Sequence, residues 1–317
     1  GELYVFHPIE VAKIVSSQIG LDAVSISAAL LHDVIEDTKY SHSKIRKLFG
    51  KKVSKIVEGL TKISNLKKDT NISLQAENFR KMLLTLNDDI RVIIIKIADR
   101  LHNMQTLDSM PEYKQIRTAS ETLYIYAPIA HRIGMYNIKT ELEDLSLKYT
   151  DYKNFNYISK KIDENKVDQK NYISKFSSLI NKRLKKENLK YFIQGRNKSI
   201  YSIYKKMEKQ NISYEDVFDK FAIRIVYKSS NKDEKFIAWK IYSIVTDLFT
   251  PNPTRLRDWI SSPKTNGYES LHITVLGPNN KWVEVQIRSE RMHEIAEKGY
   301  AAHHRYKSGF KKESEID

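Results

Sequence analysis

Four side chains in the first third of the chain are of the types that bind transition metals. They are His7, the adjacent pair His32 and Asp33, and Asp99. Two imidazoles and two carboxylates suit Mn²⁺, Fe²⁺ or Zn²⁺ better than Ca²⁺, which prefers oxygen ligands alone. A metal held in this way with open positions would turn water into a nucleophile near neutral pH. An adjacent His-Asp pair is also common by chance, and a lone pair is more often structural or merely surface-exposed than a metal site.

The surroundings of the His-Asp pair favour the metal interpretation. Glu36 and Asp37 follow His32 and Asp33 at i+4, which predicts four polar groups on one side of a helix. The residues just before them, 28–31, are apolar. Glu36 and Asp37 lie one turn beyond the pair, so we expect them to transfer protons rather than to bind the metal.

A second polar stripe contains the last metal candidate. Asp99, His102, Asn103 and Thr106 recur at i, i+3, i+4 and i+7 in a segment otherwise rich in isoleucine. A polar stripe on an apolar helix needs partners inside a helical bundle, and a divalent cation is one such partner.

The second half of the chain carries a cluster of cations where a helix is expected to begin. The segment 195–207 contains Arg196, Lys198, Ser202, Lys205 and Lys206. The free amides and the dipole of a helix N-terminus add to such charges and make a polyphosphate site. A solvated basic helix is the alternative interpretation.

Two predicted strands add carboxylates to this basic region. Asp219 and Arg224 lie in the first, residues 218–227. In the second, residues 282–288, alternation places Glu284, Gln286 and Arg288 on the face opposite three aliphatic side chains. Phosphoryl-type transfer uses carboxylates for Mg²⁺ and a base for the attacking hydroxyl, so Asp219 and Glu284 are the candidates.

The elements that must position these residues form an all-α domain followed by a mixed α/β domain, with boundaries at 1–150 and 151–317. Periodicity predicts helices first and alternating strands later, with a polar connection at 149–174 and a hairpin turn at 277–280 joining 272–276 to 282–288. The predicted helices cover residues 25–36, 43–60, 74–86, 90–107 and 115–149, then 200–210, 236–249 and 290–306.

Composition limits the classes of protein. The chain has 317 residues, 41% of them hydrophobic and 29% charged, enough for two globular domains. It has no cysteine, which excludes disulfides, thiolate zinc sites and cysteine nucleophiles and fits the cytoplasm. Apolar runs such as 92–95 are far too short to span a membrane, so we expect no membrane partner.

The net charge of +15 is unevenly distributed. Residues 1–150 hold 21 basic and 18 acidic side chains, whereas residues 151–317 hold 33 and 21. The excess in the second half predicts a polyanionic partner, with nucleic acid and nucleoside polyphosphates both open. A generally lysine-rich surface is the alternative.

The first set of motifs resembles a known hydrolase. The spacing of the four metal candidates is similar to that of HD-superfamily phosphohydrolases. The segments 1–8, 32–38 and 96–106 resemble the hydrolase domain of the long RelA/SpoT-type enzymes that make and destroy (p)ppGpp, and 125–134 resembles their linking helices, expected at about 115–185. The resemblance implies Mn²⁺, removal of the 3′-pyrophosphate, and substrate contacts from Asn103 and Thr106.

The second set resembles the synthetase domain of the same family, which is related to nucleotidyltransferases. The matching runs are 195–207, 219–224, 263–272, 284–288 and 292–303. The resemblance implies that Asp219 and Glu284 hold Mg²⁺ and that Glu284 helps to activate the 3′-hydroxyl. It further implies an adenine sandwich by Arg196 and Arg224, phosphate contacts by Lys198, Ser202 and Lys206, stacking of guanine on Tyr268, and other nucleotide contacts from Lys264, Asn266, His272, Gln286 and Arg288.

Three details of the resemblance concern the balance of the two activities. Residues 255–258 resemble a basic motif of bifunctional members. Gln105 stands where the family commonly has arginine, and the sequence begins at Gly1, where the family has a preceding Arg-Lys-Ser segment. We expect these two departures to weaken substrate binding by the hydrolase site.

The sequence therefore predicts a cytoplasmic enzyme with ATP, GDP or GTP, and (p)ppGpp as its ligands. One site would transfer pyrophosphate to GDP or GTP, and the other would hydrolyse the product. We expect ribosome contact only through C-terminal regulatory domains. The alternatives are an RNA-binding module with a degenerate metal site, and a hydrolase whose second half only senses ligand.

Overall fold

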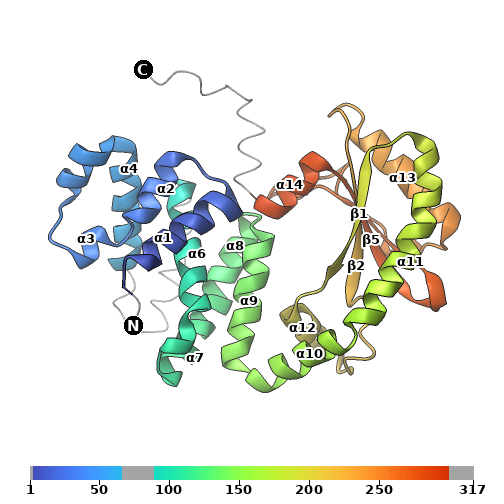
Figure 1. The fold of residues 1–317 in the computed structure, drawn as a ribbon, viewed down its shortest axis with the longest axis horizontal. Helices are drawn as coiled ribbons and strands as arrows, with labels where there is room; N and C mark the ends of the chain where they lie inside the picture. Colours follow the sequence, from blue (N-terminus) through green and yellow to red (C-terminus); the bar gives the residue numbers. More distant parts are fainter. Residues whose placement is uncertain (1–2, 66–88, 300–317) are drawn as a thin grey trace. The chain divides into compact units, whose positions relative to one another are not determined.

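The computed structural model of the chain describes residues 3–65 and 89–299. These residues form two compact units, with the division between His131 and Arg132 (Figure 1). The division falls earlier than the boundary expected at residue 150. The reason is that helix α9, Tyr136–Thr150, packs on α10, α12 and α14 of the second unit.

The first unit is helical in its described residues, as the sequence predicts. Its α-helices are α1 (Phe6–Lys13), α2 (Ala23–Leu30), α3 (Val34–Asp37), α4 (His42–Asn65), α6 (Ile90–Gln105), α7 (Glu112–Glu121) and α8 (Ala127–Arg132), the last of which ends at the division. The π-helical turns are η1 (Ile14–Ile19) and η4 (Thr122–Tyr126), and η3 (Leu107–Ser109) is a 3₁₀ turn.

Helix α6 forms the centre of the first unit. It begins after Asp89, whose carboxylate accepts a hydrogen bond from the backbone N–H of Arg91, as expected for an N-cap. Every residue from Val92 to Leu101 is buried, including Lys96 and Asp99. A helix that is buried on all sides is part of a core. Its apolar run alone would also fit a buried strand, but the length of the segment favours a helix.

The predicted helix 25–36 is interrupted, and the interruption has a clear cause. The ring nitrogen Nδ1 of His32 lies 2.8 Å from the carbonyl oxygen of Ala29. In a continuous helix that oxygen would accept from the N–H of Asp33, so the side chain replaces the backbone bond and α2 ends. His32 and Asp33 therefore lie in the turn between α2 and α3 rather than inside one helix.

Other predicted helices also differ from the structure. The segment 115–149 divides into several helices, because Gly134 adopts φ 79° and breaks the run before α9. Gly50, with φ 82°, kinks α4. The predicted connection 149–174 is instead occupied by α10 (Tyr152–Glu164) and the start of α11 (Lys166–Leu184), whose polar residues face solvent while Ile158 is buried. The predicted helix 74–86 lies outside the described residues.

The second unit is built on a five-stranded mixed sheet. Its strands are β1 (Tyr191–Asn197), β2 (Phe221–Tyr227), β3 (Arg257–Asp258), β4 (Leu271–Leu276) and β5 (Trp282–Ser289), in the order β1-β2-β5-β4-β3. Strands β2 and β5 pair in parallel, and the other neighbouring strands of this described sheet pair antiparallel. The remaining elements are α12 (Ile200–Gln210), α13 (Glu234–Leu248), α14 (Glu290–Lys298), η5 (Lys185–Glu187), η6 (Pro253–Arg255) and η7 (Pro278–Asn280).

The two faces of this sheet differ sharply in polarity. Val283, Val285 and Ile287 of β5 point into an apolar core with α11 and α13. The alternate residues of β5, from Glu284 to Arg288, lie on the opposite face, as the period-two pattern predicts. Helix α14 contacts β2 and β5. The apolar face therefore stabilises the fold through the core, and the polar face carries the candidate catalytic and binding residues.

The hairpin and most strands confirm the predicted pattern, while two strands were missed. The turn at 277–280 joins β4 to β5 as expected. Residues 195–197 end strand β1 instead of opening a helix, and neither β1 nor β3 was predicted. Helix α14 ends at Lys298, and the rest of the predicted helix 290–306 lies outside the described residues. Within the described ranges, no helix combines the length and apolar character that crossing a bilayer requires.

Two glycines fix the end of α14 against the start of α9. Both have positive φ, 66° at Gly299 and 79° at Gly134. A Cβ on Gly299 would lie 2.7 Å from the carbonyl carbon and oxygen of Gly134, whereas a Cβ on Gly134 would meet nothing closer than 3.4 Å. Backbone atoms cannot move away cheaply, so only Gly299 requires glycine for both conformation and space.

We predict that Gly299→Ala lowers the free energy of unfolding of the second unit by about 3 kcal/mol or more. The control Gly134→Ala carries only the conformational cost, about 1–2 kcal/mol. Urea denaturation followed by tryptophan fluorescence measures both losses. Equal losses in the two variants would contradict the close backbone contact.

Candidate active sites

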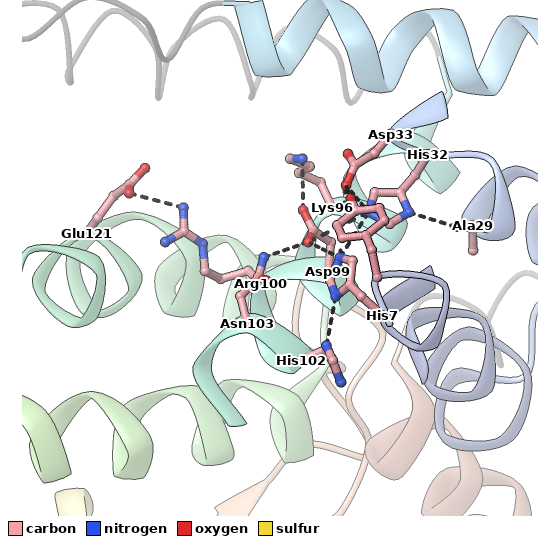
Figure 2. Close-up of polar contacts among 11 residues, drawn as sticks. His7, Ala29, His32, Asp33, Lys96, Asp99, Arg100, His102, Asn103 and Glu121 are labelled. Atoms are coloured by element: carbon pink, nitrogen blue, oxygen red, sulfur yellow. Dashed lines mark hydrogen bonds and ion pairs between the residues drawn. The ribbon is translucent and has the colours of Figure 1, made fainter. Parts of the chain in front are cut away.

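The four predicted metal ligands converge in the first unit (Figure 2). His7 comes from α1, His32 and Asp33 from the turn after α2, and Asp99 from α6. The Nε2 atom of His32 lies 2.9 Å from Asp33 Oδ2, 3.3 Å from His7 Nε2 and 3.8 Å from Asp99 Oδ1. The Nε2 atom of His7 lies 3.4 Å from Asp99 Oδ1 and 4.0 Å from Asp33 Oδ2.

These distances fit one shared divalent cation. Ligand bonds of about 2.1 Å separate neighbouring donor atoms by about 3.0–3.4 Å, and opposite ones by about 4.2 Å. All five measured separations fall between 2.9 and 4.0 Å. The donor set of two imidazoles and two carboxylates suits a transition metal. The residues present therefore fit a divalent metal.

Hydrogen bonds on the far side of the imidazoles orient the ring nitrogens that face the cluster. The Nδ1–H of His32 donates to the carbonyl oxygen of Ala29, so that in the neutral ring Nε2 carries the lone pair and faces Asp33 and His7. The Nδ1 atoms of His7 and His102 lie 2.8 Å apart (Figure 2). If His7 donates this hydrogen bond, its Nε2 is likewise available to a metal.

Asp99 is held as an anion inside the bundle. Burial acts to raise the pKa of Asp99, but the Lys96 ammonium, 2.8 Å away, and the contacts with His7 and His32 keep it well below its ordinary value. The side-chain amide of Asn103 donates to Asp99 Oδ1 at 2.6 Å. Lys96 was missed by the sequence analysis, although a lysine at i−3 in an apolar run was a usable signal. The hydroxyl of Tyr4, also missed, donates to Asp33 Oδ2 at 2.6 Å.

The other predicted residues of the first site are more exposed than the metal candidates. Glu36 and Asp37 are exposed on α3. Thr106 is exposed beyond the end of α6, and its hydroxyl donates to the carbonyl oxygen of His102. Only Asn103, of the two predicted substrate contacts, bonds directly to a metal candidate.

The second site lies on the polar face of the sheet. A pocket of about 190 Å³ brings together six predicted residues, namely Arg196, Lys198, Ser202, Asp219, Glu284 and Gln286. Strand register explains this grouping, because Arg196 pairs with Ala222 and Ala222 pairs with Glu284. Thr140 of α9 also lines the pocket. The sequence analysis missed it because α9 was assigned to the first domain.

Asp219 is surrounded by lysines. The ammonium groups of Lys198 and Lys206 both donate to its carboxylate. Burial acts to raise the pKa of Asp219, but these lysines lower it to about 2. The carboxylate is therefore ionised at neutral pH, and a divalent cation together with a polyphosphate can exchange for the lysine contacts.

Helix α12 presents its N-terminus to the same pocket. Ser199 is the N-cap and accepts from the N–H of Ser202. The carboxylate of Asp144, from α9, accepts from the N–H of Tyr201 at 2.8 Å. Burial raises the pKa of Asp144 to about 6, in spite of these backbone hydrogen bonds.

The remaining predicted nucleotide contacts lie beyond the pocket lining. Arg224 and Arg288 are buried on the same sheet face. The hydroxyl of Tyr268 lies 2.8 Å from His272 Nε2, and Lys264 lies over the ring of Tyr268. Burial lowers the pKa of His272 to about 4, so this imidazole is neutral at pH 7. The amide of Asn266 donates to the hydroxyl of Tyr136.

Two family models match separate parts of the chain. A family described as "HD domain" matches residues 1–136, and one described as "Region found in RelA / SpoT proteins" matches residues 195–311. The chain is 45% identical over 312 residues to a GTP pyrophosphokinase of Myxococcus xanthus, with coverage of 98% of this chain and 40% of the relative.

Two further relatives carry names for the opposite and the combined reaction. A probable guanosine-3′,5′-bis(diphosphate) 3′-pyrophosphohydrolase of Synechocystis is 43% identical, over 97% of this chain and 40% of the relative. The bifunctional (p)ppGpp synthase/hydrolase SpoT of Escherichia coli is 42% identical, over 97% and 43%. The chain thus spans less than half the length of these relatives.

We predict that Mn²⁺, used as a probe cation, stabilises the unmodified chain against thermal unfolding. At about 100 times the dissociation constant the gain is about 2.7 kcal/mol. His32→Asn removes a donor atom and abolishes most of this gain, whereas the control His42→Asn, on α4, retains it. A full gain in His32→Asn would exclude the four-residue cluster as the binding site.

The raised pKa of Asp144 predicts a specific pH dependence. Between pH 3.8 and about 6 the folded state holds a proton that the unfolded state has lost, so this group destabilises the second unit as the pH rises. Above pH 6 the free energy of unfolding is lower by roughly 3 kcal/mol because of this group. Asp144→Asn removes this term, so its unfolding free energy relative to the unmodified chain increases from pH 4 to pH 7. A constant difference across that range would contradict the burial of the carboxylate.

Proposed function

The chain belongs to the RelA/SpoT family, and we propose that it is the part of a bifunctional enzyme that both makes and destroys (p)ppGpp. One site transfers pyrophosphate from ATP to the 3′-hydroxyl of GDP or GTP. The other hydrolyses the 3′-pyrophosphate of the product. The observation that carries the proposal is that one chain holds two groups of residues: a cluster of His7, His32 and Asp33 with Asp99 beside both imidazoles, and a basic pocket with two carboxylates.

For the hydrolytic reaction, we assign Mn²⁺ to His7, His32, Asp33 and Asp99. When bound, the ion supplies Lewis acidity that makes water nucleophilic near neutral pH. The chain's own contribution is to hold the ligands in place, through Ala29 and Lys96 among others. Glu36 and Asp37 are the proposed proton carriers, and Asn103 and Thr106 the proposed substrate contacts.

For the synthetic reaction, Asp219 and Glu284 are the proposed ligands of Mg²⁺. Glu284 also accepts the proton of the 3′-hydroxyl while that oxygen attacks the β-phosphorus of ATP. The bond between the β-phosphorus and the oxygen bridging to the α-phosphate breaks, and AMP leaves. Lys198, Ser202 and Lys206 neutralise the phosphates.

The bases of the two nucleotides are assigned to different parts of the polar face. Arg196 and Arg224 stack on adenine, and Tyr268 stacks on guanine. The remaining contacts are assigned to Lys264, Asn266, His272, Gln286 and Arg288. The basic motif 255–258, of which Arg257 is exposed, supports a bifunctional member.

The partners of the whole protein follow from this proposal. ATP, GDP or GTP, and (p)ppGpp are the small-molecule ligands, and the cytoplasm is where they are plentiful. The relatives are more than twice as long as the matched region. Any contact with the ribosome is expected through such additional regions.

We predict that single substitutions separate the two activities. Glu284→Gln lowers AMP production from ATP and GDP by at least about 100-fold and spares ppGpp hydrolysis. Asp99→Asn has the reverse effect, because it removes a metal ligand and a buried charge partner of Lys96. Chromatography of the nucleotides measures both rates on each variant.

The control for both variants is Glu208→Gln, a carboxylate of α12 that bonds to Tyr204 rather than to the pocket residues. Persistence of AMP production in Glu284→Gln would refute its assigned role. An unmodified chain that turns over neither substrate but binds RNA with a strong salt dependence would instead support the RNA-binding alternative.

A further inference from the structure

Two buried arginines on the polar sheet face share a single carboxylate oxygen. Arg224 of β2 is 4% exposed and Arg288 of β5 is 1% exposed. Arg224 Nη1 and Arg288 Nη2 each donate to Oε1 of Glu297, on α14, at 2.9 Å. Arg288 Nη2 also lies 2.8 Å from His293 Nδ1. Glu297 was not singled out by the sequence analysis.

This arrangement leaves positive charge in excess. Two guanidinium groups face one carboxylate, and Arg196 lies close enough to repel both. Burial together with this repulsion lowers the pKa of Arg224 to about 10, whereas the two arginines hold the pKa of Glu297 below its ordinary range. Arg224 Nη2 and Arg288 Nε have no hydrogen-bond partner among the described residues. The two guanidinium groups therefore keep unused hydrogen-bond donors on the polar sheet face.

Arg224 donates its hydrogen bonds from the edge of its guanidinium group, and these bonds fix the orientation of the guanidinium plane. Arg224 Nε donates to Gln286 Oε1 at 3.2 Å, and Nη1 donates to Glu297. A guanidinium stacks on an aromatic ring through its face, while its edge forms the hydrogen bonds. Two anchored edge positions orient the plane before a base arrives, which lowers the entropy lost on stacking.

Glu297 is itself held firmly. Its second oxygen, Oε2, accepts from the side-chain amide of Asn137, on α9, at 2.8 Å. Two residues later, Gly299 packs directly against the backbone of Gly134. The hydrogen bond from Asn137 and the contact between Gly299 and Gly134 therefore hold the carboxylate of Glu297 in place independently of the two arginines.

We propose that Glu297 is a positioning residue for the ATP site, which orients Arg224 for stacking on the adenine. The inference rests on the proposed function, because that function assigns Arg224 to the adenine. Glu297 touches neither the reacting atoms nor the phosphates in this account. Glu297 raises the affinity for the nucleotide because it orients Arg224.

The test is calorimetric titration of a non-hydrolysable ATP analogue into the chain with Mg²⁺. Glu297→Ala weakens binding by about tenfold, and Glu297→Gln by about threefold, because an amide oxygen still accepts but lacks the charge. The control Glu294→Gln, on the same helix, pairs with Lys298 instead and leaves affinity unchanged. Should Glu297→Ala fail to fold, the glutamine variant decides.

A double-mutant cycle separates positioning from general packing. In an Arg224→Ala background, Glu297→Ala adds less than about twofold, because its effect is transmitted through the arginine. An equal loss in both backgrounds, or no loss in folded Glu297→Ala, would overturn the inference. If the unmodified chain does not bind the analogue, the proposed function fails instead, so the two failures are distinguishable.

Discussion

A charge removed from water requires a compensating partner, and both candidate sites follow from that requirement. Asp99 lies in a helix that is buried on all sides, so it depends on Lys96, Asn103 and two imidazoles for its ionised form. In the second unit, the carboxylate of Glu297, on α14, compensates part of the charge of two buried arginines of the sheet. The apolar surroundings that form each core therefore also fix the direction of each charged side chain.

The two sites leave opposite charges uncompensated, which is why they suit different ligands. The first gathers two imidazoles and the carboxylate of Asp33, with Asp99 Oδ1 within 3.8 Å of both imidazoles, and such a donor set suits a divalent cation. The second gathers lysines and arginines around two carboxylates, and a polyphosphate with its own cation completes it. The same contrast is visible in composition, since most of the net charge of +15 falls after residue 150. The proposed function assigns part of that excess to the phosphates of the nucleotides.

The sequence was informative where periodicity and residue chemistry agreed. Alternation in residues 282–288 correctly separated Glu284 from Val283, and the four metal candidates were identifiable from residue type and motif. It failed where a side chain replaced a backbone bond, as His32 does at the end of α2. It also failed for tertiary partners such as Lys96 and Glu297, whose roles depend on which elements pack together. No local pattern assigns α9 to the second unit.

The most direct test of the central claim is nucleotide chromatography of two incubations of the unmodified chain. The first contains ATP, GDP and Mg²⁺, and the second contains ppGpp and Mn²⁺. We expect AMP and ppGpp in equal amounts from the first, GDP and pyrophosphate from the second, and no turnover in either when EDTA is present. Turnover in only one incubation, or in either without a metal, would contradict the claim that this chain carries two complete metal-dependent sites.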